Sequence, residues 1–432
     1  MASTSLVVVT IDTLRADHLG CYGYFRDTSP NFDRFAAEGV LFESVFAPAA
    51  TTLPTHASLF TGVYPLEHGV VANLGASGKP FVWKPALRTL AQLAKERGFT
   101  TAAFVSAAPL KRHAGLAPGF DVYDQPVGAQ RNASQTLERV TRWLGETHAR
   151  PVFLWVHFFD PHRPLEPPPE HAVFSGDADL ERYLAERGVP PFGFMEKDRY
   201  ETRPDVDRYD GEIRYVDDRL GALFEALRQS GLYESSVIVL TADHGEGLNQ
   251  HGWPGHGGTH AEQLHIPLVI RFPEPERNRV GRVRALVSTV DVLPTALPGV
   301  DAVLAERFAA QASGRDTLAS GFQPQPILSR RTVRPGRETA GPLWGLTTND
   351  WRLLYDLDGP VRLFDRARDP FELDDQAAAR PDVVADLERQ SAALIHAQRA
   401  RATSLGTAEP GAVTPLDREL LLQLEALGYK EE

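Results

Sequence analysis

Five apolar runs constrain the fold of this chain most strongly. Most of them end at, or shortly before, an aspartate, serine or histidine, residue types that occur in catalytic and metal-binding sites. Residues 6–11 form a continuous, mostly β-branched run that is followed directly by Asp12. Such a run is typical of a central strand that is buried on both faces of a parallel sheet. The other runs are residues 100–106, 152–157, 236–241 and 266–272, and helical patterns alternate with them at residues 33–39, 87–98 and 210–231. We therefore expect an α/β fold with a doubly wound, mostly parallel sheet.

The residues that end these runs indicate one shared site. In a doubly wound sheet the site lies outside the carboxyl ends of the strands, where loops leave in different directions. Besides Asp12, these ends carry Ser106, Asp160 with His162, and Asp243 with His244. Acidic and histidine residues at three such ends predict a catalytic or metal-binding centre.

Residues 49–70 form a second informative stretch, which reads as a loop that turns into a helix. Its centre is Thr52-Leu-Pro-Thr-His56-Ala-Ser-Leu-Phe-Thr-Gly62. The proline fits a first helical turn and Gly62 fits the helix end. Thr52 then lies just ahead of a helix N-terminus, where unpaired N–H groups and the helix dipole favour an anion, or an alkoxide attacking one. As a nucleophile Thr52 needs a strong activator, such as a metal ion; the alternative is a plain N-cap threonine.

This stretch resembles the signature of the sulfatase family, in the alkaline-phosphatase superfamily. In that signature Cys-x-Pro-x-Arg is followed by Ala-Ser-Leu-x-Thr-Gly, and here Thr52 takes the cysteine position and His56 the arginine position. Thr-x-Pro-x-His is closer to the nucleophile loop of nucleotide pyrophosphatase/phosphodiesterases, another branch of the superfamily. Sulfatases convert the cysteine, or sometimes a serine, to formylglycine, and threonine is not a substrate for that conversion. The resemblance implies a hydrolase, while the threonine argues against ordinary sulfatase chemistry.

The resemblance also implies a metal site. Asp12, Asp243 and His244 fall on the family's metal ligands, and Thr52 would complete the set. The competing interpretation is that Asp243 caps a helix and His244 packs against a neighbour. Most sulfatases carry an Asp-Asp pair after the first strand, but here the pair is Asp12-Thr13. With one carboxylate fewer, zinc or manganese is favoured over calcium or magnesium.

A second metal site is an alternative, with Asp160, His162 and His256 as its candidate ligands. The Asp-x-His spacing departs from the two-metal phosphodiesterases and is similar to the sulfatase Asp-Pro-His-x-Pro element, in which the histidine contacts the ester. We favour one metal, with His162 and His256 as cationic or hydrogen-bonding groups around the anion. One of these histidines is expected to protonate the leaving group.

Further candidates are less specific. His56 is predicted to be catalytic because it replaces the arginine that braces the nucleophile in sulfatases. The resemblance to phosphonate monoester hydrolases makes Asn73 a substrate-binding candidate, although a turn asparagine is an equal alternative. Ser106 at a strand end, and Lys111 with His113, which mimic a sulfatase Lys-x-His pair, complete the predicted substrate-binding set.

The pattern changes after about residue 320. Short strands are expected at residues 343–347, 352–357 and 361–364, with Asp358 and Gly359 forming a hairpin turn. Helices are expected at residues 383–401 and 416–427. We therefore predict a catalytic α/β domain over residues 1–325 and a C-terminal α+β subdomain with a small antiparallel sheet over residues 326–432. The second unit matches the C-terminal subdomain of sulfatases.

Composition narrows the class of partners. A net charge of −12 argues against a nucleic-acid partner. No apolar stretch approaches the ~20 residues of a membrane span, and no targeting segment is recognised, so a cytoplasmic protein without membrane contact is expected. The expected ligand is a small anionic ester, and a homo-oligomer is compatible with the sequence.

These observations predict a metal-dependent hydrolase that cleaves phosphodiesters, phosphonate monoesters or related phosphate esters through a covalent Thr52 intermediate. A sulfuric ester hydrolase without formylglycine is the first alternative. Transfer of the phosphoryl group to an alcohol, or an inactive homologue that retains the metal, are further alternatives.

Overall fold

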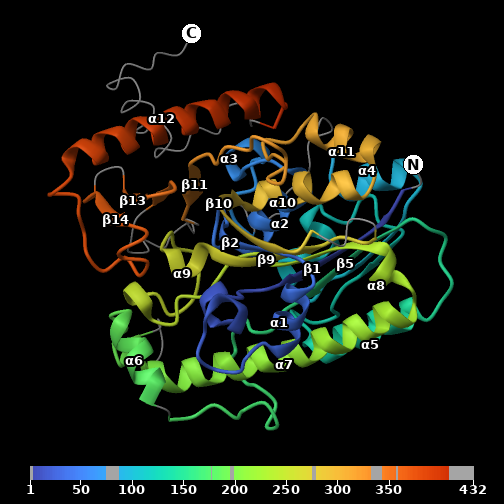
Figure 1. Ribbon diagram of the computed structural model, residues 1–432, viewed down its shortest axis with the longest axis horizontal. Helices are drawn as coiled ribbons and strands as arrows, with labels where there is room; N and C mark the ends of the chain where they lie inside the picture. Colours follow the sequence, from blue (N-terminus) through green and yellow to red (C-terminus); the bar gives the residue numbers. More distant parts are fainter. Residues whose placement is uncertain are drawn as a thin grey trace.

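The computed structural model describes residues 3–73, 87–176, 178–194, 199–274, 279–331, 343–356 and 359–407. Its centre is an eight-stranded sheet with the strand order β10-β2-β9-β8-β1-β5-β3-β4. Helices cover both faces of this sheet (Figure 1). Its strands are β1 (Ser5–Ile11), β2 (Val40–Phe46), β3 (Thr100–Phe104), β4 (Val122–Asp124), β5 (Val152–Phe158), β8 (Ser236–Ala242), β9 (His265–Arg271) and β10 (Gly281–Ser288).

Strand β1 lies in the middle of the sheet, parallel to both neighbours. Ile11 at its end is in register with Phe158 of β5 and with Ala242 of β8. All seven β1 residues are buried, as expected for a strand covered on both faces. The expected α/β fold with a mostly parallel sheet is confirmed. Strand β9 is the exception, because it runs antiparallel to β2 and β8.

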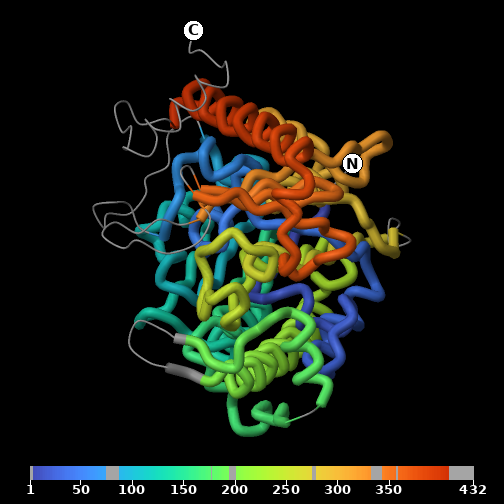
Figure 2. Tube along the Cα trace, turned by 90° about the vertical axis from the view of Figure 1, so that its left-hand side faces the viewer, coloured from blue at the N-terminus to red at the C-terminus, as the bar shows by residue number. Residues whose placement is uncertain are grey.

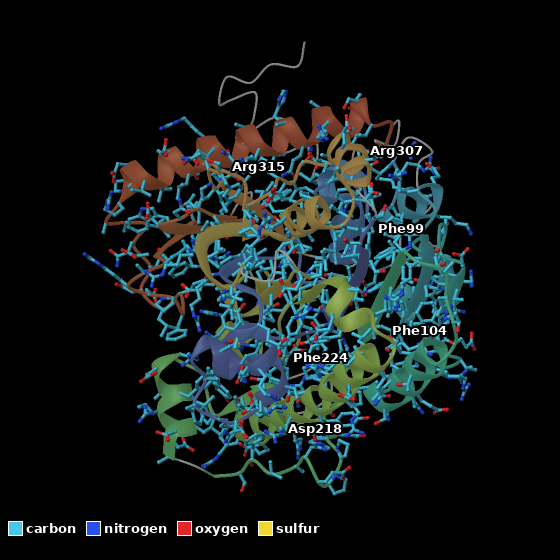
Figure 3. All side chains as sticks on the ribbon, turned by 45° about the vertical axis from the view of Figure 1, so that its right-hand side comes forward. Phe99, Phe104, Asp218, Phe224, Arg307 and Arg315 are labelled. Carbon is cyan, nitrogen blue, oxygen red and sulfur yellow. The ribbon has the colours of Figure 1, made fainter. Side chains whose placement is uncertain are left out.

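The helices form two layers. In Figure 1, α2, α4, α10 and α11 lie on one face of the sheet and α1, α5, α7 and α8 on the other. Side chains fill the space between the layers, among them the labelled Phe104 and Phe224 (Figure 3). The helices of this part are α1 (Pro30–Ala37), α2 (Thr52–Thr61), α3 (Pro65–His68), α4 (Leu90–Glu96), α5 (Ala133–Leu144), α6 (Ala178–Glu186), α7 (Thr202–Gln229), α8 (Leu232–Ser235), α9 (Ala261–Leu264), α10 (Thr289–Ala296) and α11 (Ala302–Ala309).

Three strands of the main sheet, β2, β4 and β10, were not expected from the sequence. Strand β10 forms one edge, and its first half is largely exposed, so its charged residues hide the apolar signal. Strand β2, next to it, is interrupted by a register shift between Phe42 and Val45. A short antiparallel hairpin, β6 (Phe192–Phe194) and β7 (Arg199–Glu201), precedes α7.

A separate antiparallel sheet forms the C-terminal unit, which we define as residues 327–407. Its strands are β11 (Ile327–Arg330), β12 (Trp344–Thr347), β13 (Trp351–Tyr355) and β14 (Arg362–Asp365), in that order. The long helix α12 (Pro381–Ser404) packs on this sheet, and the two form an apolar core of the C-terminal unit. The helix lies along the top of the molecule (Figure 2). The expected turn at residues 358–359 and the expected helix at 416–427 lie wholly or partly outside the described residues. The domain boundary at residue 325 stays a prediction.

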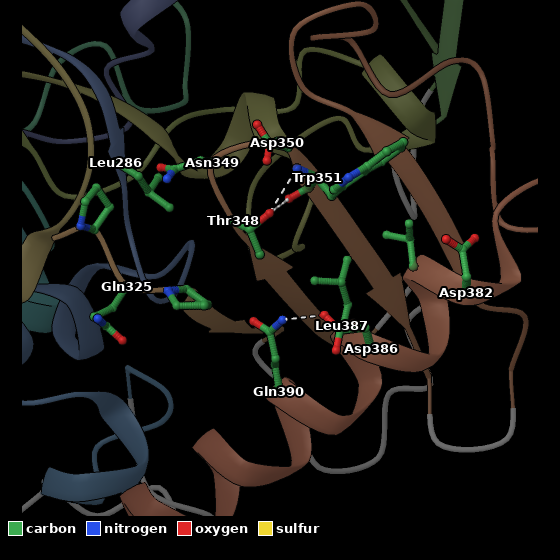
Figure 4. A pocket seen from close by; sticks show the side chains of 13 residues that line it. Leu286, Gln325, Thr348, Asn349, Asp350, Trp351, Asp382, Asp386, Leu387 and Gln390 are labelled. Carbon is green, nitrogen blue, oxygen red and sulfur yellow. Dashed lines mark hydrogen bonds between the residues drawn. The ribbon is translucent and has the colours of Figure 1, made fainter.

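A cavity of about 460 Å³ lies where the C-terminal unit meets β10. Trp351, Leu387 and Gln390 line one side and Leu286 the other (Figure 4). None of the candidate site residues lines it. Among the described helices, none is long and apolar enough to cross a membrane.

Burial of His68, at the end of α3, predicts a measurable pH dependence of stability. Val70 N–H donates to Nδ1 of His68 (3.0 Å), so Nε2 carries the proton shared with Ser58 Oγ (3.0 Å). Burial lowers the pKa of His68 to about 3, against about 6.5 in an unfolded chain. The unfolded state therefore binds a proton that the folded state does not, and the free energy of unfolding falls as the pH drops below about 6.5.

Between about pH 7 and about pH 5, His68 should account for about 2 kcal/mol of this loss in the free energy of unfolding. His68→Gln should lose correspondingly less than wild type over the same interval, as measured by chemical denaturation at the two pH values. His113→Gln, at an exposed histidine, should behave like wild type. An unchanged pH dependence in His68→Gln would contradict the assignment.

Candidate metal centre and catalytic site

The ends of β1 and β8 bring Asp12, Asp243 and His244 together. Because Ile11 and Ala242 are in register, the residues that follow them are neighbours. His244 Nε2 lies 3.7 Å from Asp12 Oδ1 and 3.5 Å from Asp243 Oδ2. The three residues form a group whose ligand atoms all lie within 4.8 Å of one another, and all three are buried.

The donor set of this group fits a cation. Both carboxylate oxygens of Asp12, Oδ2 of Asp243 and Nε2 of His244 are buried and have no hydrogen-bond partner among the described residues. His244 Nδ1–H donates to the carbonyl of Gly245 (2.9 Å), so its Nε2 presents a lone pair to the group. Buried lone pairs that face each other without a donor are costly, and a divalent metal ion satisfies them.

Burial and mutual repulsion shift the pKa values of the group. Burial and the nearby Asp243 raise the pKa of Asp12 well above its usual value. Burial lowers the pKa of His244 to about 3, which keeps the imidazole neutral. A neutral imidazole beside carboxylates is the form in which histidine binds a metal.

His157 on β5 is a residue of the site that the sequence analysis did not single out. Its Nε2 lies 3.6 Å from Asp12 Oδ2, and its Nδ1 accepts a hydrogen bond from the N–H of Ser106 (3.4 Å). The proton therefore lies on Nε2, towards Asp12. The Ser106 hydroxyl is buried and bonds to the carbonyl of His157 (2.5 Å) and to Thr136 (2.6 Å). Ser106 thus orients His157 rather than presenting its hydroxyl to a ligand.

Thr52 is the first residue of α2, beside this group. Its carbonyl accepts a hydrogen bond from Nδ1 of His56 (2.8 Å), and that nitrogen also lies 3.7 Å from Asp243 Oδ2. At the other end of α2, Gly62 has a φ of 73° and a Cβ there would lie 2.8 Å from the ring of Phe308. Only glycine allows the helix to stop there.

His56 and Asn73 hold the start of this helix. Because Nδ1 of His56 carries the proton, its Nε2 accepts a hydrogen bond from the Thr10 hydroxyl (3.0 Å), and Trp155 Nε1–H donates to the same Thr10 oxygen (3.0 Å). Both ring nitrogens of His56 therefore have partners inside the protein, and burial lowers its pKa to about 4. Oδ1 of Asn73 accepts the N–H of Leu53 (2.9 Å). These two residues position the start of α2. Because His56 is neutral, it does not supply the positive charge of the arginine that it replaces in the sulfatase signature.

His162 and His256 meet above the strand ends. Their Nε2 atoms are 3.1 Å apart. His162 Nδ1–H donates to the carbonyl of Arg163 (2.6 Å), and His256 Nδ1–H donates to the carbonyl of Ala50 (3.0 Å). Because both Nδ1 atoms carry protons, the short distance between the Nε2 atoms requires one further proton between them. The pair can therefore donate a proton to a bound anion.

The predicted alternative second metal site does not assemble from its three residues. The described residues contain three groups of metal-ligand type, and none of them includes Asp160, His162 or His256. Asp160 Oδ2 instead accepts the N–H of Ala133 (2.7 Å) and caps α5. The sequence signal was ambiguous because an aspartate after a strand serves equally well as a ligand or as a helix cap.

Lys111 and His113 lie in a surface segment of short 3₁₀ turns. Lys111 follows η3 (Ala108–Leu110) and donates to the carbonyl of Val127 (3.3 Å). His113 is exposed within η4 (Arg112–Ala114). Their roles in substrate binding stay predictions.

His256 stands on a strained loop between β8 and α9. Leu248, Asn249 and His251 have φ values of 46°, 67° and 52°. For residues with a Cβ this left-handed conformation costs about 1–2 kcal/mol each. A Cβ at Gly247 would meet the carbonyl oxygens of Trp253 and Gly255, so the loop folds tightly on itself. Contacts elsewhere must compensate for this strain.

A family model described as Sulfatase matches residues 4–302 of the chain. The chain belongs to the sulfatase family. Members and structural neighbours of this family are sulfuric or phosphoric ester hydrolases, and the protein is therefore an ester hydrolase of this kind. The sulfatase family is metal-dependent, which agrees with the donor set at the strand ends.

Individual relatives and structural neighbours are named for different substrates. The chain is 24% identical over 428 residues to YidJ of Escherichia coli K12, an uncharacterized sulfatase, covering 86% of this chain and 83% of that protein. It is 25% identical over 254 residues to human bis(5'-adenosyl)-triphosphatase ENPP4, covering 56% of this chain and 47% of that protein. The structure of a phosphonate monoester hydrolase of Agrobacterium radiobacter matches with a TM-score of 0.70 at 22% identity, covering 92% of this chain and 96% of that one.

Replacement of Asp12 should separate metal binding from folding. In the metal-free protein Asp12→Asn should raise the free energy of unfolding by about 1–3 kcal/mol, because it removes a buried, unpartnered carboxylate beside Asp243. The same variant should lose the rise in Tm that zinc or manganese gives the wild type. Thermal denaturation with and without each metal, with metal content measured by elemental analysis, checks both expectations.

Asp160→Asn is the matched control, because this carboxylate caps α5 outside the ligand group. It should lower stability but keep the metal-dependent shift and one metal per chain. Loss of metal from this control would instead support the two-metal alternative.

Proposed function

We propose that the protein cleaves phosphodiesters or phosphonate monoesters by in-line attack of the Thr52 hydroxyl. The observation that carries the proposal is the place of Thr52 at the first turn of α2, tied through His56 to the Asp12–Asp243–His244 group. A nucleophile there has helix N–H groups and the positive end of the helix dipole next to it. The substrate would be a small anionic ester.

The proposed reaction has two steps. The Thr52 hydroxyl would give up its proton to solvent before the reaction, and its oxygen then forms a bond to phosphorus while the bond to the leaving-group oxygen breaks. The leaving-group oxygen takes the proton held between His162 and His256. Water then attacks phosphorus and gives a proton back to the same pair of histidines, while the bond between phosphorus and the Thr52 oxygen breaks. The product is freed and Thr52 returns to its deprotonated state. The pair thus acts first as acid and then as base.

The ligand group would hold one divalent ion, with zinc or manganese favoured. Two carboxylates, one imidazole and a threonine hydroxyl are a mixed nitrogen and oxygen set that suits these metals better than calcium or magnesium. Such an ion lowers the pKa of a bound hydroxyl and offsets negative charge on the transferred group. His157 and Ser106 would keep Asp12 oriented towards it.

A sulfuric ester hydrolase without formylglycine is the second candidate, favoured by the family match and by the relative named a sulfatase. Thr52 favours a phosphorus ester as the substrate, because a threonine sulfate intermediate lacks the elimination step that formylglycine hydrate provides. Transfer to an alcohol in place of water would use the same residues.

Thr52 variants test the nucleophile. Thr52→Ala should lower kcat for an aryl phosphodiester by about 10³-fold or more, because no oxygen remains to form the covalent intermediate. Thr52→Ser, which keeps a hydroxyl, should retain much more activity. Steady-state kinetics after metal loading, with metal content measured in parallel, gives the comparison. Full turnover by Thr52→Ala with metal bound would exclude Thr52 as the nucleophile.

A comparison of ester classes tests the substrate assignment. Wild-type protein should turn over bis(p-nitrophenyl) phosphate and p-nitrophenyl phenylphosphonate faster than p-nitrophenyl sulfate. The three substrates share one leaving group, so the difference reports the transferred group. Preference for the sulfate would favour the second candidate.

A further inference from the structure

Glu372 of the C-terminal unit makes the central contact with the loop that carries His256. This glutamate lies in the turn between β14 and α12 and is 4% exposed. It has a φ of 57°, a left-handed conformation for a residue with a Cβ. Such an arrangement is maintained only where the surroundings determine it.

Glu372 contacts both limbs of the His256 loop. His251 Nε2–H donates to the carbonyl of Glu372 (3.2 Å) on the limb before His256. His260 Nδ1–H donates to Glu372 Oε2 (2.7 Å) on the limb after it. The two imidazole rings stack at 3.9 Å, so the limbs are also held against each other.

Arg352 of β13 completes this contact. It donates to Glu372 Oε1 (2.5 Å) and also directly to the carbonyl of Thr259 in the loop. Burial alone would raise the pKa of Glu372, but Arg352 and His260 lower it well below its usual value. Glu372 is therefore a buried, fully paired carboxylate, and removal of one partner would leave the others unpaired.

The group His251, His260, Glu262 and Glu372 has the composition of a metal site, but its protonation is that of a hydrogen-bond network. Arg362 Nη2 faces Nε2 of His260 at 3.2 Å, and a guanidinium can only donate. Nε2 of His260 is therefore the acceptor, and Nδ1 carries a proton rather than a lone pair for a metal.

We propose that Glu372 is a positioning residue for His256: by fixing both limbs of the strained loop, it holds His256 Nε2 at the distance from His162 at which the pair can protonate a leaving group. This inference rests on the proposed function, in which His162 and His256 supply that proton. Asn249, which donates to the carbonyl of Phe192 (2.9 Å), anchors the loop on its other side. The contact from the C-terminal unit thus determines how well the acid is placed, although Glu372 touches no substrate.

Two esters that differ only in their leaving group test the proposal. Phenol is a much weaker acid than p-nitrophenol, so a phenyl ester depends more on the proton that is donated to its leaving oxygen. In metal-loaded protein Glu372→Ala should lower kcat for the phenyl ester by about tenfold or more and for the p-nitrophenyl ester much less. Added to His256→Ala, the same change should cause little further loss, because both act on one step.

Asp217→Asn is the matched control for stability. Asp217 is a buried carboxylate that accepts the N–H groups of Asn31 and Phe32, away from the loop. The Asp217→Asn variant should lower Tm while leaving the ratio of the kcat values for the two esters unchanged. Glu372→Gln, which keeps an acceptor but removes the charge, gives the same comparison if Glu372→Ala does not fold.

The outcomes separate this inference from the proposed function. Equal loss for both esters in the Glu372 variants, or full additivity with His256→Ala, would overturn the positioning role. If His256→Ala itself shows no dependence on the leaving group, the proposed acid fails as well. Full activity of metal-loaded Thr52→Ala would overturn only the assignment of Thr52 as the nucleophile.

Discussion

The convergence of buried lone pairs at the ends of β1 and β8 is the constraint on which the rest of the site depends. Parallel pairing puts Ile11 and Ala242 in register, so the residues that follow them, Asp12 and Asp243, lie next to each other. Three carboxylate oxygens and one imidazole nitrogen that lack a hydrogen-bond donor among the described residues are unfavourable in a buried environment. A divalent cation bound by these residues would relieve this cost, and the sheet supplies the rigidity that keeps their side chains in place.

Each histidine around the centre has its proton placed by a second partner. His244 donates to its neighbour's carbonyl, His56 to the carbonyl of Thr52, and His157 accepts from Ser106. Burial lowers the pKa of all three, so they stay neutral with one defined tautomer. The short distance between the Nε2 atoms of His162 and His256 requires a shared proton. The site thus separates neutral orienting imidazoles from a pair of imidazoles that share a proton, which is the arrangement on which the proposed acid depends.

The sequence predicted the central strands well because strands buried on both faces are continuously apolar, as in β1 and β8. It missed β10, an edge strand whose exposed half is polar, and did not indicate that β9 runs antiparallel, since an apolar run carries no direction. In the site, Asp12, Asp243 and His244 were identified from position and motif. His157 was missed because a histidine inside a strand gives no local signal, and Asp160 proved to cap a helix.

Three features could be read from the amino-acid sequence without the structure: the α/β class, the strand ends at which acidic residues and histidines gather, and the threonine at the nucleophile position of a sulfatase signature. These are local properties, set by periodicity and by short motifs. Tertiary structure alone decided which nitrogen of each histidine carries a proton, and that Glu372 reaches a loop more than 100 residues earlier through His260. Such contacts depend on how segments far apart in the sequence pack together. This packing cannot be predicted from the periodicity of apolar residues or from the spacing of motifs.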